Sequence, residues 1–219
     1  MMRDLTLIYH QIRYQNKIFW RTPVSAFFTI VFPLMFLVLF TAIFGNDEIS
    51  SLGVTTAQFY APALAVFGAA SATYTNLSIT TAIARDEGIL KKIRGTPLPP
   101  WAYIAGRVGS AVFIALVAVV IMMSVGVLVY GVEMIGSSLA AALVTFIVGA
   151  AAFAALGLMV AALVPNGDSA PAVANATLLP LAFVSDIFIV TEDAPGWMEF
   201  LGNLFPLKHF AIAFGEAFN

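Results

Sequence analysis

The sequence predicts an all-α polytopic membrane protein with five transmembrane helices, an interfacial helix at the N-terminus and a re-entrant helical segment at the outer surface. Two observations predict this fold. Of the 219 residues, 61% are hydrophobic and only 10% are charged, whereas a soluble domain carries roughly 25% charged residues. The few Lys and Arg residues are also clustered, and long apolar segments separate the clusters. Residues 1–219 are therefore expected to form one membrane domain.

The Lys and Arg residues indicate the orientation of the chain. Nine of the ten lie in two groups, which are Arg3, Arg13, Lys17 and Arg21, then Arg85, Lys91, Lys92, Arg94 and Arg107. Cytoplasmic loops of membrane proteins carry an excess of Lys and Arg. The N-terminus and the loop 84–102 are therefore expected to face the cytoplasm, and the loops with Asp47 and Glu133 the outside. The expected location is the plasma (inner) membrane.

Five segments are long and apolar enough to cross a bilayer, which takes about 20 residues of helix. These segments are 24–44, 57–83, 103–130, 138–164 and 170–190. Turn-forming residues separate them, as in Gly45-Asn46-Asp47-Glu48 and Pro165-Asn166-Gly167-Asp168. The sequence therefore predicts five spans with short connections.

The two ends of the chain are amphipathic and too broken to span. Residues 3–20 predict a helix in the membrane interface, or else a solvated tail, with one apolar face made by Leu5, Ile8, Tyr9, Ile12 and Phe19. Near the C-terminus, Pro and charged residues interrupt short apolar stretches. We expect residues 187–207 to form a helix–turn–helix that dips in from the outside, with Trp197 at headgroup level.

Signatures of chemistry are missing from the sequence. It has no GxxxxGK[ST] phosphate loop, no HExxH and no GxSxG. It has no cysteine, and its two histidines, His10 and His209, are far apart in sequence. We therefore expect no catalytic residue, cofactor, metal ion or nucleic-acid partner, and a transport subunit rather than an enzyme.

The loop 84–102 carries the strongest local pattern. Residues 84–94 predict a short helix whose start is acidic and whose end is basic, an order that complements the helix dipole. Ile89, Leu90 and Ile93 give this helix an apolar face, and the prolines of 97–100 turn the chain back to the membrane. The alternative is a connector that maintains topology and binds nothing.

The residues of this loop resemble the loop after the second span in ABC-2-type transporter permeases. The matching residues are Arg85-Asp86-Glu87-Gly88-Ile89-Leu90-Lys91-Lys92, followed by Gly95-Thr96-Pro97-Leu98-Pro99. The resemblance continues in order through Pro180-Leu181-Ala182-Phe183-Val184-Ser185, Pro195-Gly196-Trp197-Met198 and Asn203-Leu204-Phe205-Pro206-Leu207-Lys208-His209. It covers most of the chain and includes drug-resistance and polysaccharide exporters, so it does not name a substrate.

The resemblance implies the partners. Such permeases pair as dimers, here most simply a homodimer in membrane lipid, and each binds a separate or fused ATP-binding cassette ATPase. It implies that the helix after the second span sits on that ATPase through Glu87, Ile89, Leu90, Lys91, Ile93 and Arg94. The N-terminal helix would also lie against the ATPase. Family members usually have a sixth span after the Pro-Leu-x-His stretch, and this sequence stops at Asn219, about where that span would begin.

Polar residues inside the spans are candidates for a substrate pathway. Thr73, Asn76 and Thr80 share one face of the second span, and Asn175 lies in the fifth. Hydrogen bonds between helices are the alternative role, each stabilising by about 0.6 kcal/mol.

The sequence thus predicts the permease subunit of an ATP-driven exporter for an amphiphilic drug or lipid-like molecule. A polysaccharide or lipid-linked glycan is the alternative substrate. Two other classes stay open. A secondary transporter would need coupling acids at mid-membrane, which the sequence almost lacks, and a non-transporting membrane scaffold would need only the spans and the basic loop.

Overall fold

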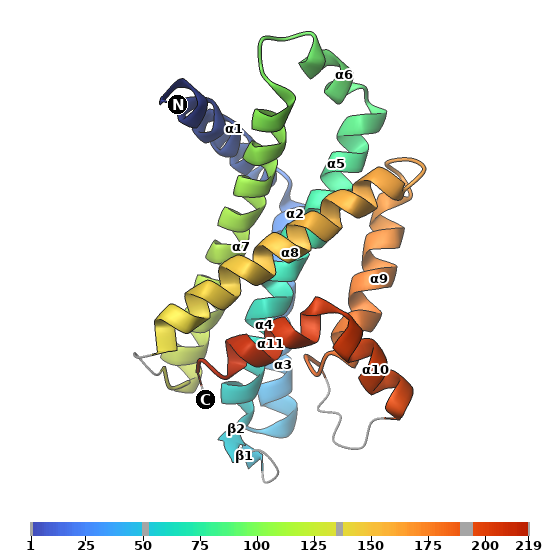
Figure 1. Ribbon diagram of the computed structural model, residues 1–219. Coiled ribbons are helices and arrows are strands. Elements are labelled where there is room, and N and C mark those ends of the chain that lie inside the picture. Colours follow the sequence, from blue (N-terminus) through green and yellow to red (C-terminus); the bar gives the residue numbers. More distant parts are fainter. Residues whose placement is uncertain (1, 50–52, 135–137, 189–194, 219) are drawn as a thin grey trace.

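The computed structural model describes residues 2–49, 53–134, 138–188 and 195–218, and these residues are almost entirely helical. The helices run between two ends of the molecule (Figure 1). One end carries the short helix α6 (Ile89–Arg94), and the other carries a small antiparallel pair, β1 (Glu48–Ile49) and β2 (Val54–Thr55). The all-α fold class is confirmed.

The N-terminal third forms two helical segments. α1 (Met2–Trp20) confirms the expected first helix, and α2 (Pro23–Ala26), the π-helix η1 (Phe27–Val31) and α3 (Phe32–Phe44) follow as one segment. The expected apolar face of α1 is only partly correct. Phe19 is buried and Ile8 and Ile12 are half-buried, but Leu5 and Tyr9 are exposed by about three-fifths. The half-buried face of α1 includes Gln11 and Gln15 instead.

The helical segment that follows the β1–β2 pair lies at the centre of the molecule. It runs without a break through α4 (Thr56–Ala70), the π-helix η2 (Ser71–Asn76) and α5 (Leu77–Asp86). α4 is buried along nearly its whole length, and it packs against α3, α7 (Pro100–Tyr130) and α11 (Pro206–Gly215). The Thr55 hydroxyl starts α4 by accepting a hydrogen bond from the Gln58 backbone N–H at 3.2 Å.

Three helical segments of the described residues are long and apolar enough to cross a membrane: Pro23–Phe44, α7 and α8 (Leu139–Leu163). The central segment Thr56–Asp86 carries several Ser and Thr residues and is not among the three. α9 (Ala170–Val184) is apolar but has only 15 residues. The expected count of five spans is therefore not confirmed.

The C-terminal region forms two helices near the β1–β2 end. α10 (Gly196–Leu204) and α11 meet at Phe205, where extended backbone and Pro206 separate them. The expected helix–turn–helix within 187–207 is not confirmed, because the described part of this range holds α10 and only the first two residues of α11, which runs to Gly215. Residues 189–194 of the expected segment lie outside the described residues, and its re-entrant character stays a prediction.

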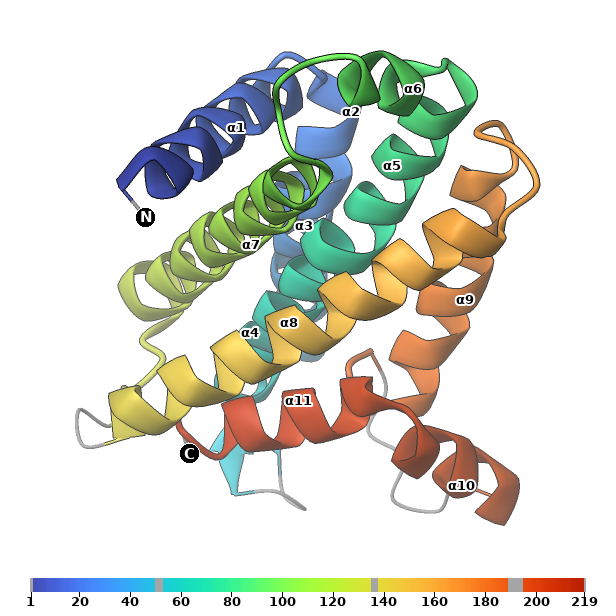
Figure 2. The same cartoon turned by 45° about the horizontal axis from the view of Figure 1, so that its top comes forward.

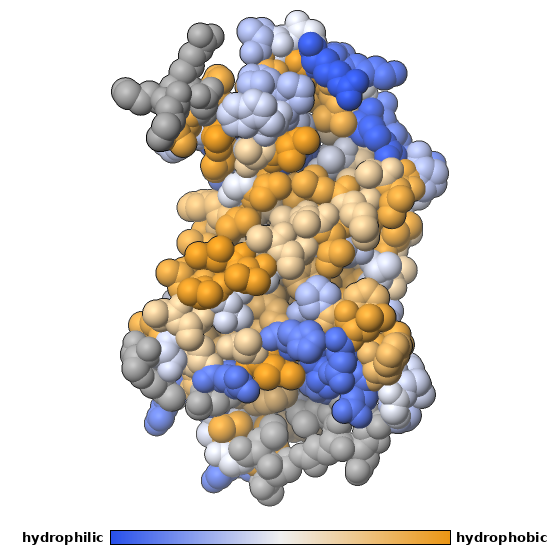
Figure 3. Space-filling view, viewed as in Figure 1, coloured by the Kyte–Doolittle hydropathy of each residue, from blue (hydrophilic) through white to orange (hydrophobic). Residues whose placement is uncertain are grey.

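The hydropathy of the surface changes along the length of the molecule. Hydrophilic residues gather near the two ends, and a hydrophobic band lies between them (Figure 3). Many large apolar side chains of the long helices are exposed, including Val38 on α3, Val120 on α7 and Leu143 on α8. Such a band is the surface that hydrocarbon covers in a membrane protein.

Candidate functional site

The four polar residues expected along a substrate pathway do not converge. Thr73 is fully buried, and its hydroxyl donates to the Ala69 carbonyl at 2.7 Å. The Thr80 hydroxyl donates to the Asn76 carbonyl at 2.7 Å. Asn175 is exposed on α9. Both threonine hydroxyls thus bond within their own helix, while Asn76 and Thr80 share the wall of a cavity.

The π-helix η2 contacts α8 closely. A Cβ placed on Gly157 would lie 2.8 Å from the Thr73 carbonyl oxygen and 2.9 Å from that of Tyr74, so only glycine fits there. Tyr74 also shares a hydrogen bond of 2.5 Å with the Thr177 hydroxyl on α9. The sequence analysis missed Tyr74 and Thr177. The π-helices that interrupt α-helices are often found at functional sites.

A cavity of about 690 Å³ lies between α1, α5, α6 and α7. We call it the inner cavity, because it lies at the end of the molecule that carries α6. Its wall combines Asn76 and Thr80 with Glu87, Ile89 and Ile93. Two of the four predicted pathway residues and three residues of the predicted docking helix therefore line one cavity. Its volume lies within the range of about 300–1,000 Å³ of ligand pockets.

The inner cavity contains a buried cation that the sequence analysis used only for topology. Arg107 lines the cavity and is only 7% exposed. Its guanidinium lies 5.4 Å from the centre of the Tyr103 ring and donates to the Tyr103 hydroxyl. The two residues are four positions apart on α7 and therefore lie on the same face. Among the described residues, no carboxylate lies within ion-pair distance of Arg107.

Two glycines place α1 beside this arginine. A Cβ on Gly106 would lie 2.3 Å from the Gln11 Cβ, and one on Gly109 would lie 2.7 Å from the Ile12 Cδ1. α1 therefore lies directly on α7 and closes one side of the cavity. Figure 2 shows α1, α6 and the start of α7 at the same end of the molecule.

The prediction of one helix over 84–94 is wrong about where that helix begins. Gly88 has a left-handed backbone with φ of 71° and separates α5 from α6. Asp86 and Glu87 therefore stand at the end of α5 and do not begin α6. Ile89 and Ile93 face the inner cavity, and Leu90 is half-buried outside its lining. Glu87, Lys91 and Arg94 are exposed at this end of the molecule.

A polar clamp fixes the end of α5 to the α8–α9 turn. The Arg85 guanidinium donates to the carbonyls of Ala161 at 2.8 Å and Ala162 at 3.3 Å, in the last turn of α8, and of Val164 at 2.7 Å, the residue after α8. The Asp86 carboxylate accepts a hydrogen bond from the Gly167 N–H. It also forms an ion pair with Arg85, with 3.5 Å between Arg85 Nη2 and Asp86 Oδ1. A cation is favourable at a helix C-terminus.

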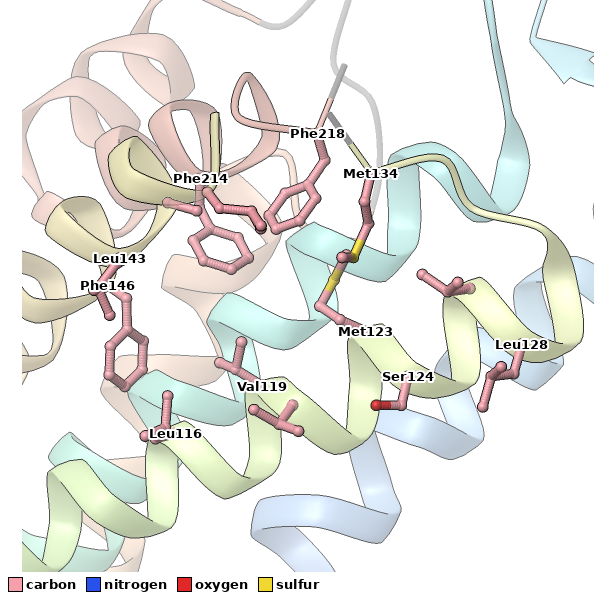
Figure 4. Close-up of a pocket in the computed structure, with 14 residues that line it drawn as sticks. Leu116, Val119, Met123, Ser124, Leu128, Met134, Leu143, Phe146, Phe214 and Phe218 are labelled. Carbon is pink, nitrogen blue, oxygen red and sulfur yellow. The ribbon is translucent and has the colours of Figure 1, made fainter. Parts of the chain in front are cut away.

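A second cavity, the outer cavity, lies at the other end of the molecule. It measures about 440 Å³ between α7, α8 and α11, and Ser124 is the one polar side chain in its lining. Figure 4 shows Met123 and Leu116 on α7, Phe146 on α8 and Phe214 on α11 around this space. Near the same end, Lys208 on α11 pairs with Asp186 at 3.2 Å, just after α9.

The described residues hold no group of three His, Asp or Glu side chains that could bind a metal ion. Comparison with known proteins assigns the family of the chain. The ABC-2 type transporter model matches residues 6–218. The chain belongs to the ABC-2 type transporter family.

Two curated relatives agree with this family. The daunorubicin resistance ABC transporter permease protein DrrB1 of Streptomyces coeruleorubidus is 33% identical over 201 residues, covering 89% of this chain and 68% of that protein. The probable multidrug ABC transporter permease YbhR of Escherichia coli is 24% identical over 133 residues, covering 61% of this chain and 36% of YbhR. The resemblance found in the loop motifs is thereby confirmed, and the chain is a membrane permease of the ABC-2 type.

Proposed function

We propose that this chain is the membrane subunit of an ATP-driven exporter that moves an amphiphilic drug or lipid-like molecule out of the cytoplasm. The observation that carries the proposal is the position of α6. This helix lies between the end of α5 and the start of α7, and it presents exposed charges at one end of the molecule. The chain that carries it belongs to the ABC-2 type family. Permeases of this family work with ATP-binding subunits.

The orientation follows from the exposed cations. Arg13, Lys17 and Arg21 on and after α1, together with Lys91 and Arg94 on α6, are exposed, and α1 and α6 lie at the same end (Figure 2). By the positive-inside rule this end faces the cytoplasm.

Five spans fit this orientation. The helix Thr56–Asp86 measures about 46 Å at 1.5 Å per residue, which exceeds a hydrocarbon core of about 30 Å. Its polar residues are tolerated because it is central and its neighbours cover most of it. α9 alone measures about 22 Å, so we propose that it crosses together with the residues after it.

Coupling follows from the geometry of α6. An ATPase that contacts Glu87, Lys91, Arg94 and the half-buried Leu90 would move α5 and α7 at the same time, because α6 lies between them in the chain. Ile89 and Ile93 would transmit that push to the inner cavity, because they form part of its wall. ATP binding can shift the protein between inward and outward states only through such differential contacts. A second copy of the chain would complete the route, with the substrate passing at the dimer interface.

The test is transport in vesicles that contain this chain with and without its ATPase. Because DrrB1 is named for daunorubicin resistance, daunorubicin and a fluorescent phospholipid are suitable first probes. The proposal predicts ATP-dependent movement of a probe only when both subunits are present. Co-purification of the ATPase without ATP-dependent transport of any amphiphile would favour a scaffold, and transport without the ATPase would favour a secondary transporter.

A further inference from the structure

We infer that the inner cavity is a binding site for an anionic phospholipid of the cytoplasmic leaflet, with Arg107 binding the lipid phosphate. The inference starts from the cost of a buried charge. A guanidinium removed from water needs an opposite charge or a full set of hydrogen-bond acceptors. Arg107 has five N–H donors, and its described hydrogen-bond partner is the neutral Tyr103 hydroxyl. No Arg107 nitrogen is among the buried atoms of the described residues that lack a partner, so the remaining donors face the open cavity. An anion entering the cavity would complete this set.

The chemistry of the site favours phosphate over a carboxylate of the chain itself. The guanidinium is planar and binds two oxygens of a phosphate at once. Tyr103 holds it in place through the ring face and the hydroxyl. Asn76, Gln11 and Ser110 line the same cavity and supply further donors. Glu87, at the exposed end of α5, lies beyond ion-pair distance from Arg107.

The rest of the cavity favours an acyl chain. Apolar side chains from five helices line it, among them Ile18 on α1, Ile79 and Ile83 on α5 and Ile114 on α7. A free phosphate ion would leave this apolar wall facing water, whereas a phospholipid covers it and places its charge at Arg107 at the same time. Apolar contact with such a wall contributes about 0.8 kcal/mol for each buried CH₂ group.

The depth of Arg107 also fits a lipid headgroup. Trp101 is half exposed near the start of α7, where the aromatic belt of a membrane protein lies. Arg107 lies about 9 Å further along the helix axis. α1, which is expected in the membrane interface, lies beside it at Gly106 and Gly109. The Arg107 side chain reaches back toward Tyr103, one turn nearer to Trp101 and to the end that carries α6.

The inference requires neither ATP nor an ATPase, so binding to the purified full chain tests it independently of the proposed transport. Native mass spectrometry in detergent would compare phosphatidylglycerol, a diacylglycerol with the same chains, and inorganic phosphate. We expect one retained phosphatidylglycerol per chain, at least tenfold weaker binding of the diacylglycerol, and no retained phosphate ion. A single charge-assisted contact of this kind accounts for about a tenfold change or more.

Variants locate the site. Arg107→Gln should weaken phosphatidylglycerol binding about tenfold or more. Arg107→Lys should weaken this binding less, because the positive charge remains although a lysine cannot bind two phosphate oxygens at once as the planar guanidinium does. Arg13→Gln is the matched control, since Arg13 is an exposed cation on α1 and does not line the cavity. A thermal unfolding scan of each variant checks that the fold is intact, and Tyr103→Phe replaces Arg107→Gln if that variant does not fold.

Three results would overturn the inference. Equal binding by wild type and Arg107→Gln would place the lipid elsewhere. An equal loss in Arg13→Gln would show surface attraction without a built site. Retention of inorganic phosphate as strong as that of phosphatidylglycerol would show a free-anion site and not a lipid site.

Discussion

Removal of the Arg85 guanidinium should loosen the junction between α5 and α8. The two short hydrogen bonds, to Ala161 at 2.8 Å and to Val164 at 2.7 Å, carry most of its effect, and the bond to Ala162 at 3.3 Å adds little. A hydrogen bond with a charged donor contributes about 1.5–3 kcal/mol. The side chain is 32% exposed, so water can replace part of this loss. We expect Arg85→Ala to lower the free energy of unfolding by about 2–3 kcal/mol.

The measurement is thermal unfolding of the purified chain in detergent. A loss of this size should lower Tm by about 5–10 °C for a chain of this length. Arg85→Lys should fall between wild type and Arg85→Ala, because one ammonium cannot reach both carbonyls equally well. Lys92→Ala removes an exposed cation of the neighbouring helix α6 and serves as the control, with an expected change within about 0.5 kcal/mol.

The same variant separates docking from transmission. Arg85 connects the end of α5, next to α6, to the turn between α8 and α9. Arg85→Ala should therefore retain binding of the ATPase while transport per ATP hydrolysed falls. If Arg85→Ala unfolds within 1 °C of Lys92→Ala, the three bonds contribute nothing measurable and the clamp is refuted.

Three further predictions follow from topology, docking and helix contact. Single cysteines at Asp47 should label from outside the cell and those at Lys92 should not, and external labelling at Lys92 would reverse the orientation. Leu90→Asp should weaken binding of the ATPase by a few kcal/mol, seen as a loss of co-purification, because it places an unpaired charge in the contact. Lys91→Ala should have a much smaller effect. Normal assembly of Leu90→Asp would leave the loop as a connector. Gly106→Leu should displace α1 from α7, because the Cβ alone would lie 2.3 Å from the Gln11 Cβ. Faster tryptic cleavage after Arg13 in Gly106→Leu than in wild type measures this displacement.

The sequence predicted what depends on long apolar runs and on the placement of charge. The segments around 24–44, 103–130 and 138–164 correspond to the three helical segments that can cross a membrane, because length and hydrophobicity decide that property locally. The segments 57–83 and 170–190 are also helical. Their crossing stays a prediction, since one is polar and central and the other is short.

Errors arose where a contact between distant residues, or the backbone conformation of one residue, decides the outcome. The face of α1 depends on Gly106 and Gly109 of α7, which admit Gln11 and Ile12 closely. The start of α6 depends on the left-handed backbone of Gly88, a conformation that glycine adopts at little cost. The inner cavity could not be predicted at all, because Gln11, Asn76 and Arg107 come from three separate helices.

α6 has two sides, and the link between them is the main mechanical consequence of the structure. Its exposed side carries Lys91, Lys92 and Arg94, while Ile89 and Ile93 on the other side form part of the inner cavity. Glu87 and Gly88 connect it to α5, whose end the Arg85 clamp joins to α8. A partner that moved α6 could not leave the cavity unchanged, because one helix of six residues carries both surfaces. A ligand beside Arg107 would in turn change the cost of moving α6, since coupling between two binding sites is reciprocal. Binding of phosphatidylglycerol should therefore alter the affinity for the ATPase, and the affinity for the lipid should change by the same factor when the ATPase binds.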